Sequence, residues 1–170
     1  MMCKTYLTYV NTTGDQLSPV ELDQAKQMEY ALLNHQVLLK KSIGVNSFLI
    51  HYEEFCKFSV WESDFNISFL KLDTKYIGIC YWKLTDEDKT ANVQYCEIYG
   101  MYIKEEYRNK GYGKKLFKHT LNQIYKKYPN AQIALTVTAT NEAAIKLYKA
   151  SGFTTTSAVT LVKPAKEIRT

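Results

Sequence analysis

Apolar side chains recur along the chain at two intervals, and these intervals predict an alternation of helices and strands. Spacings of three to four residues, typical of a helix with one buried face, occupy residues 18–40 and 111–127. The buried face of the later stretch is expected to carry Phe117, Leu121 and Ile124. Runs rich in β-branched and aromatic residues predict the strands. These cover residues 4–11, 66–72, 76–84, 93–103, 132–138 and 153–162, the last as one strand or a pair.

Local signals mark where these elements begin and end. Ser18, Pro19 and Glu21 form a helix start, with a capping box and a proline at the first helical position. Turns are expected at residues 12–15, 73–75 and 86–90, and a further helix at 47–61. No repeat, low-complexity segment or linker interrupts the pattern, so residues 1–170 are expected to form one α/β domain.

The run from Arg108 to Gly113 lies between an apolar, strand-like stretch and an amphipathic helix. A strand that turns into a helix presents unpaired backbone N–H groups, which bind phosphates. Gly111 and Gly113 lack a Cβ atom, so an anion can approach the backbone closely. The cations at this helix start oppose the helix dipole unless a polyanion is bound; they are Arg108, Lys110, Lys114 and Lys115. The run predicts a phosphate-binding turn, although an ordinary turn with solvated cations fits it equally well by itself.

A second informative segment, residues 141–153, predicts a short capped helix. Asn141 suits the N-cap, and Gly152 is placed to end the helix in the left-handed conformation. Tyr148 has a ring that can pack with Ala144 one turn earlier and a hydroxyl group that needs a partner. Tyr148 is therefore either an ordinary amphipathic side chain or a functional group.

Together these two segments resemble the GNAT superfamily of acyl-CoA-dependent N-acyltransferases. The family's first motif is Arg or Gln, two residues, Gly, one residue, and Gly or Ala; its second is a helix with conserved spacing of Asn, Ala, Tyr and Gly-Phe. The matching residues here are Arg108, Gly111 and Gly113, then Asn141, Ala144, Tyr148, Gly152 and Phe153. The resemblance is firm over residues 95–153. It implies an α/β (α+β) fold, with a mostly antiparallel sheet of six to seven strands, a V-shaped splay, and helices on both faces.

The resemblance also implies a reaction: an acetyl group moves from acetyl-CoA, the co-substrate, to a primary amine that attacks the thioester directly. We expect no metal ion, because no two cysteines lie within metal-ligand spacing and the three histidines are scattered. The cofactor-binding positions correspond to Met101, Tyr102, Ile103, Arg108, Asn109, Lys110, Gly111, Tyr112, Gly113, Lys114, Asn141, Ala144 and Tyr148. A backbone N–H from Met101 or Tyr102 would polarise the thioester carbonyl, and the sequence leaves that choice open. Asn141 is explained equally well by its capping role.

Two residues are candidates for proton transfer. By the resemblance, Tyr148 donates a proton or hydrogen bond to the departing sulfur. The attacking amine must lose a proton, because a lysine-type amine is mostly protonated at pH 7. Glu97 is the candidate base, since it stands in an apolar strand eleven residues before Arg108, as in histone-acetylating members. A water chain in its place, or a structural Glu97 paired to a lysine, remains open.

Composition and charge narrow the range of partners and cellular locations that we expect. The net charge of +5 favours an anionic partner such as a coenzyme, but the cations form no dense run, so we expect no nucleic-acid partner. The four cysteines lack metal-ligand spacing, and no signal peptide or membrane span is evident, so we expect a reduced, cytoplasmic protein with no membrane partner. The acceptor is expected to be a small-molecule or peptide amine, in a pocket shaped by residues 17–66, and the family allows a homodimer. A non-catalytic acyl-CoA-binding or regulatory module is the main alternative, and a basic nucleic-acid-binding domain is a third possibility.

Overall fold

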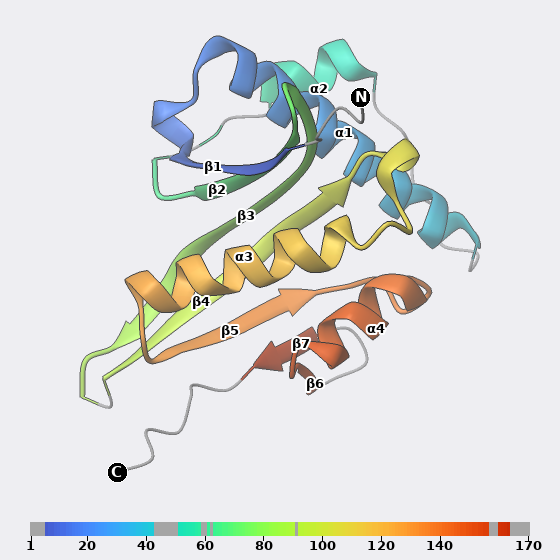
Figure 1. Cartoon of the computed structure of the whole chain (residues 1–170). Helices are drawn as coiled ribbons and strands as arrows, with labels where there is room; N and C mark the ends of the chain where they lie inside the picture. Colours follow the sequence, from blue (N-terminus) through green and yellow to red (C-terminus); the bar gives the residue numbers. More distant parts are fainter. Residues whose placement is uncertain are drawn as a thin grey trace.

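The computed structural model describes residues 6–42, 51–58, 61, 63–90, 92–156 and 160–163. Its strands form one mixed sheet in the order β1-β2-β3-β4-β5-β7-β6 (Figure 1). Only β4 and β5 run parallel; the other neighbouring pairs are antiparallel. The strands are β1 (Leu7–Thr13), β2 (Asn66–Leu72), β3 (Lys75–Asp88), β4 (Val93–Ile103), β5 (Ala131–Thr136), β6 (Thr154–Thr155) and β7 (Thr160–Lys163).

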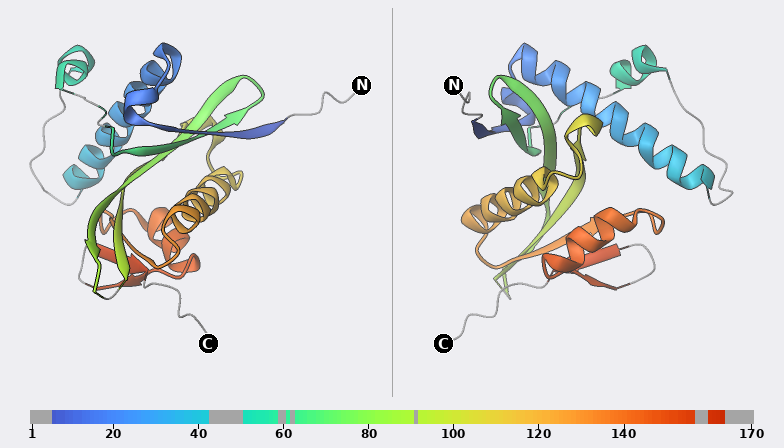
Figure 2. Two further views of the ribbon diagram at one scale, coloured as in Figure 1. Left: turned by 90° about the vertical axis from the view of Figure 1, so that its left-hand side faces the viewer. Right: turned by 45° about the vertical axis from the view of Figure 1, so that its right-hand side comes forward.

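Helices cover both faces of the sheet, as expected (Figure 2). They are α1 (Pro19–Ser42), α2 (Tyr52–Phe58), α3 (Tyr112–Lys127) and α4 (Glu142–Ala150), with short 3₁₀ helices at Gly14–Gln16 and Glu105–Tyr107. Successive strand residues point to opposite faces, so Ile79 of β3 packs in the α1 cluster and Cys80 in the α3 and α4 cluster. The sheet is thereby held between two hydrophobic layers.

The local signals at the helix ends act as expected. The Ser18 backbone N–H donates to Glu21 Oε2 at 2.9 Å, and the Glu21 N–H donates to Ser18 Oγ at 3.3 Å, which completes the capping box of α1. At the end of α4, Gly152 has a φ of 88°, and the Phe153 N–H donates to the Tyr148 carbonyl at 3.1 Å. This closing turn folds Phe153 back onto the helix.

Three sequence-based boundaries differ from the structure. Residues 12–13 are strand rather than turn, because they pair with β2 and the chain turns only at Gly14. β3 runs to Asp88, so much of the turn expected at 86–90 is strand: Asp86 pairs with Tyr95 and Asp88 with Val93. The exposed side chains of Asp86 and Glu87 are compatible with this pairing because a hairpin end faces water. α2 lies within the helix predicted at 47–61, whose remaining residues fall partly outside the described ones.

The packing of Gly100 against Tyr81 gives a test of the fold. A methyl group on Gly100 would overlap the Tyr81 ring. Gly100→Ala is therefore expected to lower the free energy of unfolding by about 1–3 kcal/mol, as overpacked cores do. Gly113→Ala is the control, since its Cβ would lie 3.8 Å from Ile103 Cγ1, an ordinary contact. Urea denaturation of both variants measures the difference, and equal stability would contradict the packing.

Candidate active site

The site begins where two central strands separate. β4 and β5 pair in parallel from Gln94 and Ala131 to Ile98 and Leu135. β4 then continues to Ile103 with β3 alone as its partner, and the two strands diverge (Figure 1). One edge of residues 99–103 therefore faces an opening, and its backbone polar groups have no strand beside them.

The backbone directions at this edge follow from one hydrogen bond. The Lys104 N–H donates to the carbonyl of Ile77 in β3 at 2.9 Å. N–H directions alternate along an extended strand, so the Tyr102 N–H also points toward β3. The N–H groups of Met101 and Ile103 therefore point the other way, into the opening between β4 and β5.

A β-bulge precedes these residues. On β3, Tyr81 faces Gly100 and the next residue, Trp82, faces Ile98, so Tyr99 is the extra residue of β4. A bulge bends a strand and redirects a side chain. The Tyr99 side chain is 41% exposed, whereas Ile98 and Gly100 beside it are buried.

The predicted phosphate turn stands at the end of β4. Asn109 and Gly111 both adopt left-handed backbone angles, with φ of 60° and 78°, and Gly111 is the N-cap of α3. Left-handed residues within a turn bring successive N–H groups together into a concave surface that binds anions. The chain thus forms, just beyond the open edge of β4, the backbone shape that the glycine spacing predicts.

A cavity of about 690 Å³ runs from this turn along the open edge of β4 to the start of α4. The predicted cofactor-binding residues that line it are Met101, Tyr102, Ile103, Arg108, Asn109, Gly113, Asn141 and Ala144. A smaller cavity of about 80 Å³ adjoins it, sharing Met101, Asn141 and Ala144 and reaching Tyr148 and Tyr99. Two segments far apart in the sequence therefore meet in one site.

Tyr148 is the most buried polar side chain of the smaller cavity. It is 8% exposed, and its ring packs against Phe117 with centroids 5.0 Å apart. Burial raises the pKa of the Tyr148 hydroxyl well above its usual value, with a further contribution from Cys80. Tyr148 is thus a protonated donor that faces the cavity.

Several predicted residues do not line either cavity: Lys110, Gly111, Tyr112, Lys114 and the base candidate Glu97. The Lys110 ammonium donates to the Glu106 carbonyl at 2.8 Å, which turns it back onto the preceding 3₁₀ helix. Arg108 lines the larger cavity, but its Nε donates to the Ile103 carbonyl at 2.9 Å. The cation charge is therefore partly engaged by the protein's own backbone.

Glu97 faces Lys83 across the β3–β4 pair, as the structural alternative expects. The Lys83 ammonium nevertheless forms an ion pair with Asp64 at 3.2 Å, and the Tyr99 hydroxyl donates a hydrogen bond to Glu97. Glu97 is half-buried rather than buried. Its link to the cavity is thus through Tyr99, which sequence reasoning missed.

One wall of the larger cavity comes from α1, where sequence reasoning placed no cofactor contact. Leu32, His35 and Leu39 line it, and their spacing of three and four residues puts them on one helical face. Burial lowers the pKa of His35, Arg108 lowers it further, and Glu105 opposes this. The helical periodicity was the available signal, but it does not tell which helix will cover a cleft.

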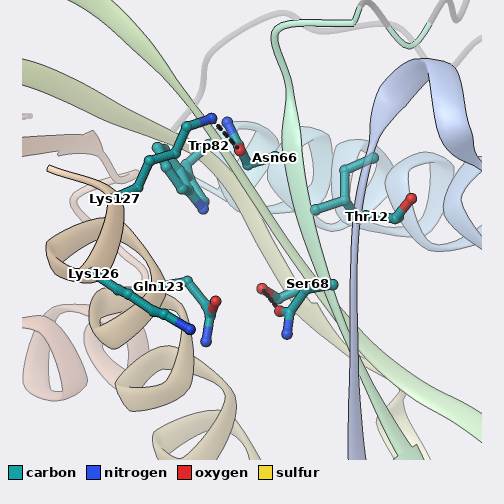
Figure 3. A pocket seen from close by; sticks show the side chains of 9 residues that line it. Thr12, Asn66, Ser68, Trp82, Gln123, Lys126 and Lys127 are labelled. Carbon is teal, nitrogen blue, oxygen red and sulfur yellow. Dashed lines mark hydrogen bonds between the residues drawn. The ribbon is translucent and has the colours of Figure 1, made fainter.

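A further cavity, of about 310 Å³, lies between the end of α3 and strands β1 and β2 (Figure 3). The Lys127 ammonium there donates to Asn66 Oδ1 at 3.1 Å, while Lys126 and Gln123 face Ser68 across the gap. None of the predicted site residues lines it. The predicted site residues that line a cavity therefore do so at the opening between β4 and β5.

Comparison with known proteins agrees with this geometry. A sequence model of the acetyltransferase (GNAT) family matches residues 40–153. The chain belongs to this family. It is an acyltransferase. No curated protein has a significantly similar sequence.

Solved structures share the fold at low sequence identity. The ribosomal-protein-S18-alanine N-acetyltransferase of Escherichia coli is 17% identical over 96% of this chain and 99% of its own, with a TM-score of 0.62. NAA60 of Arabidopsis thaliana, in complex with a bisubstrate analogue, is 17% identical over 94% and 100%, with a TM-score of 0.62. PaiA N-acetyltransferase of Thermoplasma acidophilum, in complex with coenzyme A, is 18% identical over 92% and 99%, with a TM-score of 0.61.

The described residues contain neither a metal-binding cluster nor a membrane-spanning helix. No group of three or more His, Cys, Asp or Glu side chains there is arranged to hold a metal ion. Within the same part of the chain, none of the helices is long and apolar enough to cross a membrane. The described cysteines Cys56, Cys80 and Cys96 are free thiols.

Proposed function

We propose that this GNAT acyltransferase is a single-domain N-acetyltransferase, which moves the acetyl group of acetyl-CoA to a primary amine by direct attack on the thioester. One observation carries the proposal: one cavity joins the anion-binding turn, the open edge of β4 and the start of α4, and a smaller cavity that shares Met101, Asn141 and Ala144 with it reaches Tyr148. A molecule with a diphosphate at one end and a reactive carbonyl at the other matches this arrangement.

The cofactor would lie along the open edge of β4. Backbone N–H groups of residues 109–114 would bind its diphosphate, with charge from Arg108, which lines the cavity; Lys110 would add charge only after leaving the Glu106 carbonyl. The pantetheine arm would pair with residues 101–103 as an added strand. Met101 is our choice for the N–H that polarises the carbonyl, because the Lys104 bond to Ile77 implies that the Met101 N–H faces the opening. One such donor to an oxyanion contributes about 2.7–4 kcal/mol in other enzymes.

The chemical step then needs one proton donor and one acceptor. The neutral amine attacks the carbonyl carbon, the carbon–sulfur bond breaks, and the sulfur receives a proton from Tyr148. Because burial raises the pKa of Tyr148, the hydroxyl is protonated throughout the neutral range and is ready to donate. Glu97 would accept the proton that the incoming ammonium loses.

The acceptor is an amine of a small molecule or a peptide. Among the structural neighbours, one is named for alanine of a ribosomal protein, and others are aminoglycoside acetyltransferases, so the fold alone favours neither class. The α1 residues that line the cavity support a role for residues 17–66 in the acceptor pocket. A cytoplasmic location and a homodimer stay predictions.

Release of free thiol from acetyl-CoA is the direct test. We expect release with at least one member of a panel of amino acids, polyamines, aminoglycosides and peptides with free N-termini, measured with a thiol-reactive dye. Release with none of them, while coenzyme A still binds, would favour the non-catalytic module.

Coenzyme A should stabilise the protein, since a ligand that binds only the folded state adds about 2.7 kcal/mol at a hundred times its Kd. Gly111→Glu is expected to abolish the rise in melting temperature, because its carboxylate meets the diphosphate. Gly111→Ala is the matched control: it has the same strained φ of 78° and no close neighbour. Thermal melts with and without coenzyme A measure the rise in melting temperature for both variants. Full stabilisation of Gly111→Glu would contradict the placement of the diphosphate.

Tyr148→Phe should lower kcat by about a hundredfold, the lower end of what a general acid contributes. The reaction should not stop, because binding still positions the amine and the thioester. The KM for acetyl-CoA and the melting temperature should change little, since the phenyl ring keeps the packing on Phe117 and Phe153. Steady-state kinetics measure this, and an unchanged kcat would remove Tyr148 from the mechanism.

A further inference from the structure

We propose that Tyr99 is a catalytic residue that takes the proton of the incoming ammonium and passes its own hydroxyl proton to Glu97. This inference rests on the proposed acetyl transfer and assigns the route of the proton that the amine must lose. It changes the role of Glu97 from direct base to the final acceptor behind a tyrosine.

The residues around the reacting position leave few candidates. The smaller cavity, which Tyr148 and Met101 line, has no Asp, Glu or His among the described residues on its walls. Tyr99 and Tyr148 are the ionisable side chains that line it. Since Tyr148 is assigned to the sulfur, Tyr99 remains for the amine.

The backbone explains why Tyr99 reaches this position. As the extra residue of the β4 bulge, it has no partner on β3 and is 41% exposed, between two buried neighbours. The bulge directly precedes Gly100 and Met101, whose N–H is the proposed carbonyl donor. A side chain redirected here lies beside the path of the nucleophile rather than in the sheet.

Glu97 is connected to the cavity by a hydrogen bond. The Tyr99 hydroxyl donates to the Glu97 carboxylate, which does not itself line either cavity. The oxygen of Tyr99 keeps lone pairs that can accept from an ammonium. Tyr99 thus has one proton to give and one to receive, along a line from the cavity to Glu97.

Neighbouring side chains hold the Tyr99 ring in place, and the net charge of the groups near it favours the binding of a cation. The ring meets Phe65 edge to face, with centroids 5.2 Å apart, and the Lys83 ammonium lies 5.5 Å from its centroid. Asp64 pairs with that ammonium at 3.2 Å. The charged groups that act on Tyr99 are therefore two carboxylates, Glu97 and Asp64, against one ammonium.

These groups also exclude Tyr99 as the final base. Burial raises the pKa of Tyr99, Glu97 and Asp64 raise it further, and Lys83 opposes them. A phenolate is therefore disfavoured, and a proton that arrives on the oxygen must be matched by one that leaves. The Glu97 carboxylate accepts it.

The protons balance over one turnover. The ammonium R–NH₃⁺ gives one proton to the Tyr99 oxygen while the Tyr99 hydroxyl proton moves to Glu97, which leaves R–NH₂. The nitrogen bonds to the carbonyl carbon, the carbon–sulfur bond breaks, and Tyr148 protonates the sulfur. The amide nitrogen sheds a second proton, which restores Tyr148 through water. Glu97 releases its proton to solvent, which gives amide, thiol and one proton as products.

The pH dependence of kcat/KM tests this relay, with the best amine from the thiol-release panel. Tyr99→Phe and Glu97→Gln should each lose about a hundredfold or more at pH 7. The variants must capture the rare neutral amine from solution, so their kcat/KM should rise about tenfold per pH unit toward the pKa of the amine. The difference in kcat/KM between each variant and the wild type should therefore become smaller as the pH rises.

Two comparisons separate the relay from a packing effect. The double variant Tyr99→Phe/Glu97→Gln should be no slower than either single variant, because both remove the same proton path. Phe65→Leu loosens the ring but keeps the hydroxyl and the carboxylate, so it should retain the wild-type shape of the pH profile. Coenzyme A should stabilise all these variants as it does the wild type.

The results distinguish a failure of the relay from a failure of the proposed acetyl transfer. A Tyr99→Phe enzyme with wild-type rate and pH profile, or additive losses in the double variant, would overturn the relay and leave the acetyl transfer intact. Absence of thiol release by the wild-type enzyme with every amine would instead remove the proposed function, and the relay with it.

Discussion

The structure depends on the point where β4 stops pairing with β5. Up to Ile98 the two strands satisfy each other's backbone groups, and beyond it β4 has a partner on one side only. An open strand edge inside a protein requires something to bind its polar groups. The turn at residues 108–113, α4 and α1 all gather around this edge and form the cavity. The fold thus creates the site by leaving one row of hydrogen bonds unmade.

The parts of the site that sequence predicts are those determined by local geometry. Gly111 is left-handed and Asn141 caps α4, because short-range sterics and capping bonds dictate both. The wall formed by α1 depends on how a distant helix docks, which no spacing within it reveals. The bulge at Tyr99 is likewise invisible in the sequence, since tyrosine is an ordinary strand residue and only the register with β3 displaces it. The candidate base could therefore be chosen from the sequence without notice of Tyr99, which lines the smaller cavity while Glu97 does not.

Two tyrosines of raised pKa stand on different elements of the same small cavity. One is enclosed by the rings of Phe117 and Phe153; the other is hydrogen-bonded to a carboxylate. The same side chain can therefore donate a proton to a leaving group in one setting and pass one on in the other. Environment, rather than residue type, distinguishes the two proposed roles.

The hydrogen bond from Arg108 Nε to the Ile103 carbonyl ties the anion-binding turn to the last residue of β4. The chain between these two residues is short, and the 3₁₀ helix at Glu105–Tyr107 stiffens it. The anion-binding turn is thereby held next to the open edge of β4. In the proposed complex, the groups that bind the diphosphate and the groups that bind the adjoining part of the pantetheine arm would therefore keep a fixed spacing.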